Sequence, residues 1–356
     1  MPTRPHSLEP RTESIRLVFA YRNFAASRGV SHIGLGVSAS NTARTLRRRG
    51  VWSEVWPITT ADELRQRLQA EANSARLPVS HVVICAPWVP TAQLQALAAE
   101  FGETHFVVIS HSNVGFLMAD ANGIRLLREA TDLQVGTHNF SVAGNCRRFT
   151  DWASKTWGQP VALLPNLYDI STMRPAAARR PWEGGTLRIG CFGATRPLKN
   201  AITSAAAACE LAATLKVDVE FWVCTGRAEG GAGVENAVKQ MVVGATGMKL
   251  MESPWRPWPA FRRVVRGMHL LMQPSFTESF IVVTADGIAE GVASVVSDAI
   301  DWTPASWAAR ADDAGDVAKT ALLLLHDQHA ALDGQRALSE YVEAGTGVWM
   351  KMLMGG

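Results

Sequence analysis

The sequence lacks paired cysteines, long apolar runs and a strong excess of charge. Its five cysteines are scattered, with no CxxC pair and no spacing typical of zinc, which argues against a disulfide framework and favours free thiols in a reducing compartment. No apolar run approaches the roughly 20 residues that span a bilayer, and the polar start MPTRPHSLEPRTES has no apolar segment of a secretory signal. We therefore expect a cytoplasmic protein without a transmembrane segment.

The composition is that of a folded protein with more than one core. Its 356 residues are 47% hydrophobic and 19% charged, which fits two domains of about 150–200 residues. The net charge is only +3, but arginines gather in three clusters, each of which is either a solvated helix face or a surface for an anionic partner. The clusters are Arg44, Arg47, Arg48 and Arg49; Arg174, Arg179 and Arg180; and Arg256, Arg262, Arg263 and Arg266.

Short β-rich runs alternate with helical stretches in the first half of the chain. Continuous apolar runs such as HVVIC and HFVVIS, separated by helices, predict a parallel sheet that is covered on both faces. Thr60 and Glu63 predict the capped start of one of these helices. The expected strands are 16–21, 51–58, 81–85, 105–110, 134–137 and 161–165.

The alternation restarts after a break rich in Pro, Ala, Arg and Gly, RPAAARRPWEGG. Strands are expected at 187–192, 217–224, 248–251, 268–272 and 294–297, with a helix at 314–326. The fold class is therefore α/β, with two Rossmann-like doubly wound domains. The expected parts are a flexible N-terminus (1–14), an N-terminal Rossmann-like domain (15–173), a linker (174–185), a C-terminal Rossmann-like domain (186–335) and a C-terminal helix (336–356) that could pack back on the N-terminal domain.

Candidate site residues follow the strands of the second half, because ligands of open α/β sheets bind at the carboxyl ends of strands. Arg196 and Lys199 lie in the loop that begins at Gly193, and both could reach one diphosphate. The alternative is an exposed loop with ordinary basic residues.

The turn PSFTESF precedes a helix expected to begin near Phe280 or Ile281. Its free N–H groups, from Ser279 to Val282, can hold a phosphate. Glu278 stands before this helix, and Asp286 stands two turns into it, where a carboxylate could accept hydrogen bonds from a ribose diol. The alternatives are a capping carboxylate for Glu278 and an exposed helix residue for Asp286.

The first half carries further candidates, in a glycine loop and near two histidines. The glycine loop around His32, with Gly34 following, would let the backbone approach a ligand, or it is simply a flexible loop. His111 ends the strand at 105–110, where an imidazole can polarise a hydroxyl, although such a histidine is often structural. Asn113 could assist His111, and His138 is a weaker candidate for the same role.

Five segments, in this order along the chain, resemble family-4-like glycosyltransferases of the GT-B fold (the glycosyltransferase group 1 type). They are RGVSHIGLGVSASNTARTLRRRG, LLPNLYD, IGCFGATRPLKN, SPWRPWPAFRRVVRGMHLLMQPSFTESF and ESFIVVTADGIAEGVASVVSD, and the likeness covers most of the chain from about Arg16. Two positions depart from the family pattern: Asp286 replaces a glutamate and Ile281 replaces a glycine. Both departures bear on how the donor is held.

The resemblance implies two domains facing a cleft, with the acceptor on the N-terminal domain (15–173) and the nucleotide sugar on the C-terminal domain (186–335). It implies a co-substrate of UDP or GDP type, without a tightly bound cofactor or a metal site. Transfer to a hydroxyl acceptor would retain the anomeric configuration. It implies catalytic roles for His111, Arg196, Lys199 and Glu278. Donor binding is implied for Gly193, Ser279, Phe280, Ile281, Val282, Asp286 and Gly34, and an acceptor side for His32, Asn113 and His138.

The acceptor stays open at this stage. A glycan or lipid-linked saccharide is expected, with peripheral membrane contact through the basic segment 45–49 as one possibility. Hydroxymethylated DNA is an alternative, since the arginine clusters and twelve tryptophans would suit phosphate contacts and a flipped base. A non-catalytic nucleotide-sugar-binding module and, less favoured, a sugar-nucleotide epimerase are the alternatives of other classes.

Overall fold

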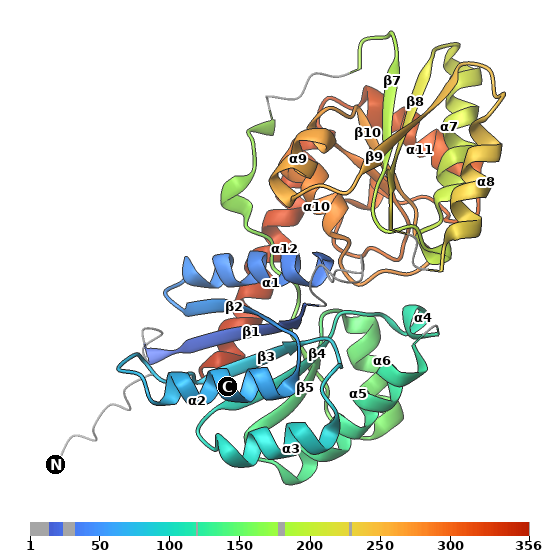
Figure 1. Ribbon diagram of the computed structural model, residues 1–356. Coiled ribbons are helices and arrows are strands. Elements are labelled where there is room, and N and C mark those ends of the chain that lie inside the picture. The colour runs from blue at the N-terminus through green and yellow to red at the C-terminus, as the bar shows by residue number, and fades with distance from the viewer. Residues whose placement is uncertain (1–13, 24–32, 119, 177–181, 228–229, 356) are drawn as a thin grey trace. The chain divides into compact units, whose positions relative to one another are not determined.

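A computed structural model describes residues 14–23, 33–118, 120–176, 182–227 and 230–355. The chain divides into two compact units, which are residues 1–169 with 343–356, and residues 170–342. The first passage between them falls at Asp169 and Ile170, a few residues before the expected linker at 174–185. Each unit is built on its own parallel sheet (Figure 1).

The first unit contains a six-stranded parallel sheet in the order β2-β1-β3-β4-β5-β6. Its strands are β1 (Arg16–Arg22), β2 (Trp52–Ile58), β3 (His81–Cys85), β4 (His105–Ser110), β5 (Phe140–Gly144) and β6 (Ala162–Leu163). Its helices are α1 (Ile33–Arg47), α2 (Ala61–Ala72), α3 (Thr91–Glu100), α4 (Val114–Leu117), α5 (Ala121–Leu133) and α6 (Arg147–Trp157).

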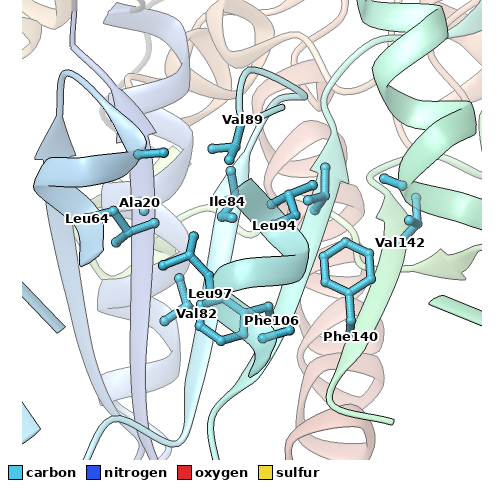
Figure 2. Close-up of a cluster of buried hydrophobic side chains, with 14 of the residues drawn as sticks. Ala20, Leu64, Val82, Ile84, Val89, Leu94, Leu97, Phe106, Phe140 and Val142 are labelled. Carbon is cyan, nitrogen blue, oxygen red and sulfur yellow. The ribbon is translucent and has the colours of Figure 1, made fainter. Parts of the chain in front are cut away.

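Both faces of this sheet are buried, as its continuous apolar runs predict. On one face, β-strand residues such as Val82, Ile84 and Phe106 pack against Leu64 of α2 and Leu97 of α3 (Figure 2). The other face packs against α1 and against the end of the last helix, α12 (Ala330–Leu353). The indole of Trp349 in α12 meets Phe19 edge-on and donates to the Pro165 carbonyl at 2.7 Å.

The second unit has a five-stranded parallel sheet in the order β11-β10-β7-β8-β9. Its strands are β7 (Leu187–Cys191), β8 (Val219–Thr225), β9 (Met248–Pro254), β10 (Leu270–Gln273) and β11 (Ser294–Val296). Its helices are α7 (Ala201–Leu215), α8 (Ala232–Val242), α9 (Trp258–Arg266), α10 (Val282–Ala289), α11 (Ala314–His326) and the first part of α12. α7 packs with α8 and α11, and α9 with α10 (Figure 1).

Most expected strands are present, but the one at 134–137 is wrong. Those residues continue α5 as a 3₁₀ turn, η2 (Gln134–Gly136), and the strand is Phe140–Gly144 instead. Val135 is largely exposed, so a strand there would bury no apolar face, whereas Phe140 and Val142 enter the core. The side-chain oxygen of Gln134 also accepts a hydrogen bond from the Val142 N–H. Gln134 therefore contacts the strand β5 through its side chain and is not itself part of the sheet.

The predicted helix cap at Thr60 is confirmed. Its side-chain oxygen accepts from the Glu63 N–H at 3.2 Å, and Glu63 in turn accepts from the Thr59 N–H at 2.8 Å. All five cysteines are free thiols; three are buried, while Cys191 and Cys209 are half-buried. In the part of the chain that the structure describes, no helix is long and apolar enough to cross a membrane.

Two half-buried histidines predict that the stability of the first unit depends on pH. His81 and His105 begin neighbouring strands with ring centroids 6.0 Å apart. Burial, and secondarily the neighbouring His105, lowers the pKa of His81 to about 4 from an ordinary value of 6.5. The unfolded chain therefore takes up this proton first, so the stability present above about pH 6.5 is lost as the pH falls toward 4.

We expect the free energy of unfolding in urea to be lower at pH 5 than at pH 7, by on the order of 1–2 kcal/mol from His81 alone. The His81→Phe variant cannot take up the proton. Its free energy of unfolding should therefore differ less between pH 5 and pH 7 than that of wild type, by the same amount of about 1–2 kcal/mol. An unchanged difference in the variant would show that the pH dependence arises elsewhere.

Candidate functional site

The carboxyl ends of β7 and β10 form the topological switch point of the second unit. From β7 the chain moves through β8 to β9 on one side, and it returns to β10 and β11 on the other. The loops after β7 and β10 therefore leave the sheet in diverging directions, and such a crevice is where open α/β sheets bind ligands. The two strands end at Cys191 and Gln273.

A buried asparagine ties these two loops together. Asn200, at the end of the loop after β7, donates from Nδ2 to the carbonyls of Pro274 at 2.9 Å and of Ala311. Its Oδ1 accepts from Thr203, and the Phe276 N–H donates to the Leu198 carbonyl at 3.0 Å. Asn200 itself takes the left-handed conformation, with φ 58°, which asparagine tolerates better than most residues. The loop after β7 is thus fixed against the loop after β10.

The structure brings Lys199 and Glu278 into direct contact across these loops. The Lys199 ammonium forms a salt bridge with Glu278 Oε1, which also accepts from the Ser275 hydroxyl at 3.1 Å. Both side chains of the pair are largely buried. Glu278 is therefore not simply a cap of the following helix: it holds Lys199 in place. Arg196 lies three residues before Lys199, and both residues line one pocket at this edge of the sheet.

The helix α10 begins at Val282, shortly after Glu278 in the chain, and its N-cap residue makes no side-chain cap hydrogen bond. Its N-cap residue, Ile281, has φ 59° and ψ 83°, a strained conformation for a β-branched residue. The Ile281 side chain is buried, and it is not among the residues that line the pocket along the carboxyl ends of β7, β8 and β10. The preceding Phe280 stacks on Trp302 and Tyr341, and its carbonyl accepts from the Trp302 indole at 2.8 Å, which fixes the approach to the helix.

Asp286 is not the exposed helix residue that one of the two sequence-based expectations describes. It is buried, not exposed, and Oδ1 accepts a hydrogen bond from the indole N–H of Trp258 in α9 at 2.9 Å. The carboxylate therefore joins α10 to α9. A ribose contact for Asp286 stays a prediction, and it would require the carboxylate to keep Trp258 as a partner or to release it.

A pocket with about 550 Å³ of empty space, part of it open to solvent, runs across the carboxyl ends of β10, β7, β8 and β9. Its wall includes Gly193 (φ 123°), Arg196 and Lys199. These are the three residues that the sequence analysis singled out in the loop after β7. The loop is also tied to α8, because Thr195 donates to Glu235 at 3.0 Å. Sequence reasoning missed five polar wall residues: Gln273, Thr225, Glu235, Lys239 and Glu252. The polar end of the apolar strand LLMQ was the available signal for Gln273.

The first unit places His111 and Asn113 together at the carboxyl edge of its sheet. His111 follows β4 directly, and Asn113 caps α4 by accepting from the Val114 N–H at 2.7 Å. Burial lowers the pKa of His111 to about 4, against the opposing effect of its hydrogen bond with Asn166. The imidazole is therefore neutral at pH 7 and can donate or accept one hydrogen bond at each nitrogen.

The remaining described candidates, His138 and Gly34, lie at different edges of the sheet. His138 precedes β5, so it lies at the amino-end edge of the sheet, near His105 and opposite the edge of His111. Gly34 lies exposed in the first turn of α1, with no atom within 4 Å of a Cβ added there. His32 lies outside the described residues. The switch point of this sheet lies between β1 and β3, and the predicted glycine loop follows β1. Tyr21 and Ala86, the latter with φ 70°, stand at the ends of these two strands and were not predicted.

Asn200 gives a direct test of the tie between the loops. Asn200→Ala should lower the free energy of unfolding by about 2–3 kcal/mol, because two carbonyls lose their donor inside the protein. Asn200→Gly, which keeps the left-handed conformation without strain, should lose nearly as much. The matched control is Asn236→Ala on the exposed face of α8, expected within about 0.5 kcal/mol of wild type. A Gly variant as stable as wild type would show that the amide contributes little.

No family model matches the chain, and no curated protein sequence does either. Solved structures do share its fold. The UDP-forming α,α-trehalose-phosphate synthase of Burkholderia xenovorans superposes with a TM-score of 0.62 at 10% identity, over 95% of this chain and 98% of that chain. Sucrose-phosphate synthase of Thermosynechococcus elongatus gives 0.61 at 13% identity, over 95% and 97%.

The N-terminal domain of the trehalose-6-phosphate phosphatase of Candida albicans is similar to the same extent, with a TM-score of 0.63 at 11% identity over 96% of each chain. Identities this low show the fold and not the activity. The expectation of fold class is confirmed: the chain has two doubly wound parallel α/β units and the GT-B fold.

Proposed function

We propose that the protein is a glycosyltransferase that moves a sugar from a nucleoside-diphosphate sugar to a hydroxyl acceptor. The observation that carries the proposal is the arrangement at the switch point of the second unit. There Arg196 and the Glu278-held Lys199 line one pocket, and α10 begins shortly after Glu278 without a side-chain cap hydrogen bond from its N-cap residue. Fixed cations and a helix N-terminus together are a site for a diphosphate.

The same groups suit the chemistry of transfer. The costly event is departure of the nucleoside diphosphate, whose negative charge grows as the bond to the sugar breaks. Cations already fixed in place stabilise that charge without reorganising during the reaction. Arg196 and Lys199 would supply this stabilisation from the protein itself, which is why we propose transfer that does not depend on a metal.

The details of donor and acceptor are further parts of the proposal. The Burkholderia xenovorans synthase is UDP-forming, and a second structure of such a synthase from that organism was solved with glucose-6-phosphate. We take UDP as the first nucleotide to test and a saccharide as the acceptor class. Retention of the anomeric configuration follows from the resemblance of the sequence motifs. The neutral His111 would meet a sugar hydroxyl in the first unit.

DNA as the acceptor has less support. Arg48 pairs with Asp169, while Arg262 and Arg266 both pair with the buried Glu290. These arginines therefore have structural partners within their own units and are not simply an open phosphate-binding surface. Trp56, Trp307 and Trp349 are fully buried, so they are not stacking platforms for a flipped base.

Replacement of the pocket's charged residues tests the proposal. Arg196→Ala, Lys199→Ala and Glu278→Ala should each lower turnover of the donor about 100-fold or more. Glu278→Ala acts indirectly, by freeing the Lys199 ammonium. The matched control is Lys319→Ala on the exposed side of α11, which should retain full activity. The measurement is release of nucleoside diphosphate from UDP-, GDP-, ADP- and dTDP-sugars, with and without saccharide or hydroxymethylated DNA.

A nucleotide-sugar-binding module without turnover is the second candidate. It is favoured by Asp286, whose carboxylate is buried and bonded to Trp258. Under this reading the wild-type protein is stabilised by a nucleotide sugar but releases no diphosphate, whatever acceptor is added. Full activity of all three alanine variants would contradict the site assignment, and absence of any donor binding would contradict both readings.

A further inference from the structure

One buried amide in the pocket has no hydrogen-bond partner. Gln273 is the last residue of β10; its side chain is 2% exposed, and its Nε2 bonds to none of the described residues. Gln273 lines the pocket together with Gly193, Arg196 and Lys199. Buried donors are almost always paired in native proteins, so a donor left unpaired at a pocket wall indicates a partner that arrives with the ligand.

Two other buried groups make this position distinctive. The hydroxyls of Thr284 in α10 and Ser294 in β11 are also buried without a partner. Neither residue lines the pocket, so no ligand there could reach them directly. Gln273 differs because it combines an unpaired donor with empty space beside it.

The neighbours of Gln273 indicate which part of a ligand it would meet. Lys199 and Arg196, which line the pocket with Gln273, carry only donors. α10 begins nine residues after Gln273 in the chain, and its N-cap residue makes no side-chain cap hydrogen bond. The carboxylates at the pocket already have partners. Of the two that line the pocket, Glu235 accepts from Thr195 and Glu252 pairs with Lys239. Glu278, next to Lys199, accepts from Lys199 and Ser275. A sugar hydroxyl or a nucleobase edge presents donors as well as acceptors, whereas a diphosphate presents only acceptors. A set of groups made mainly of donors therefore fits the diphosphate best.

We propose that Gln273 donates a hydrogen bond from Nε2 to a diphosphate oxygen of the nucleotide donor. The inference rests on the proposed function and adds to it a neutral third binding residue beside the two cations. Because the contact is to the diphosphate, Gln273 contributes equally to every nucleotide sugar that the protein accepts. The unpaired amide destabilises the free protein and stabilises the complex.

Gln273→Met tests this, because methionine has similar volume and no donor. The free variant should melt at the same temperature as wild type or higher, since an unpaired buried donor is gone. Its dissociation constants for UDP and for inorganic pyrophosphate, measured by calorimetry, should both rise about 10–100-fold, the usual effect of one hydrogen bond to a charged group. UDP-glucose should lose affinity by the same factor as UDP.

Thr284→Val and Ser294→Ala are the matched controls, because each removes an unpaired buried hydroxyl away from the pocket. Both should bind UDP and pyrophosphate as wild type does. Wild-type affinity of Gln273→Met for both ligands would overturn the inference, and so would a loss confined to UDP-glucose, which would place the contact on the sugar. A lower melting temperature of the free variant with unchanged ligand-induced shifts would show a purely structural role. Failure of the wild-type protein to bind any of the three ligands would instead overturn the proposed function.

Discussion

The tie between the loop after β7 and the loop after β10 is the constraint on which the candidate site depends. The two strands are neighbours at the switch point, but their loops diverge and have no sheet hydrogen bonds to hold them. Asn200 links the loops by buried hydrogen bonds to the carbonyls of Pro274 and Ala311. The salt bridge between Lys199 and Glu278 is a second link between the two loops. Without these bonds Lys199 would be an ordinary flexible cation, and orienting it on each binding event would cost conformational entropy.

Burial gives the site its electrostatic strength and also limits it. Lys199 and Glu278 are mostly shielded from water, so their mutual attraction is strong, but each also reduces the net charge of the other. A diphosphate arriving at the pocket must therefore be held by several donors acting together: the cations, the start of α10 and, as we propose, Gln273. These groups come from two segments far apart in sequence, the loop after β7 and the stretch from the end of β10 to the start of α10.

Much of the fold followed from local pattern. Continuous apolar runs such as 81–85 and 105–110 are buried on both faces wherever a parallel sheet forms, so they predict their strands well. The strand at 134–137 was wrong because short apolar runs carry little information unless burial is known, and Val135 remains exposed. His138 was grouped with His111 by residue type, yet strand direction places the two at opposite edges of the sheet.

The sequence by itself determined the α/β alternation, the two-part organisation and the loops that carry Arg196, Lys199 and Glu278, because these depend on local periodicity and on loop positions after strands. Only the tertiary structure decided which of those charges meet. The pairing of Lys199 with Glu278 and the burial of Asp286 against Trp258 each join residues far apart in the chain. The unpaired amide of Gln273 is likewise defined by what surrounds it in space. Such contacts depend on strand order and helix packing, which a single sequence does not encode locally.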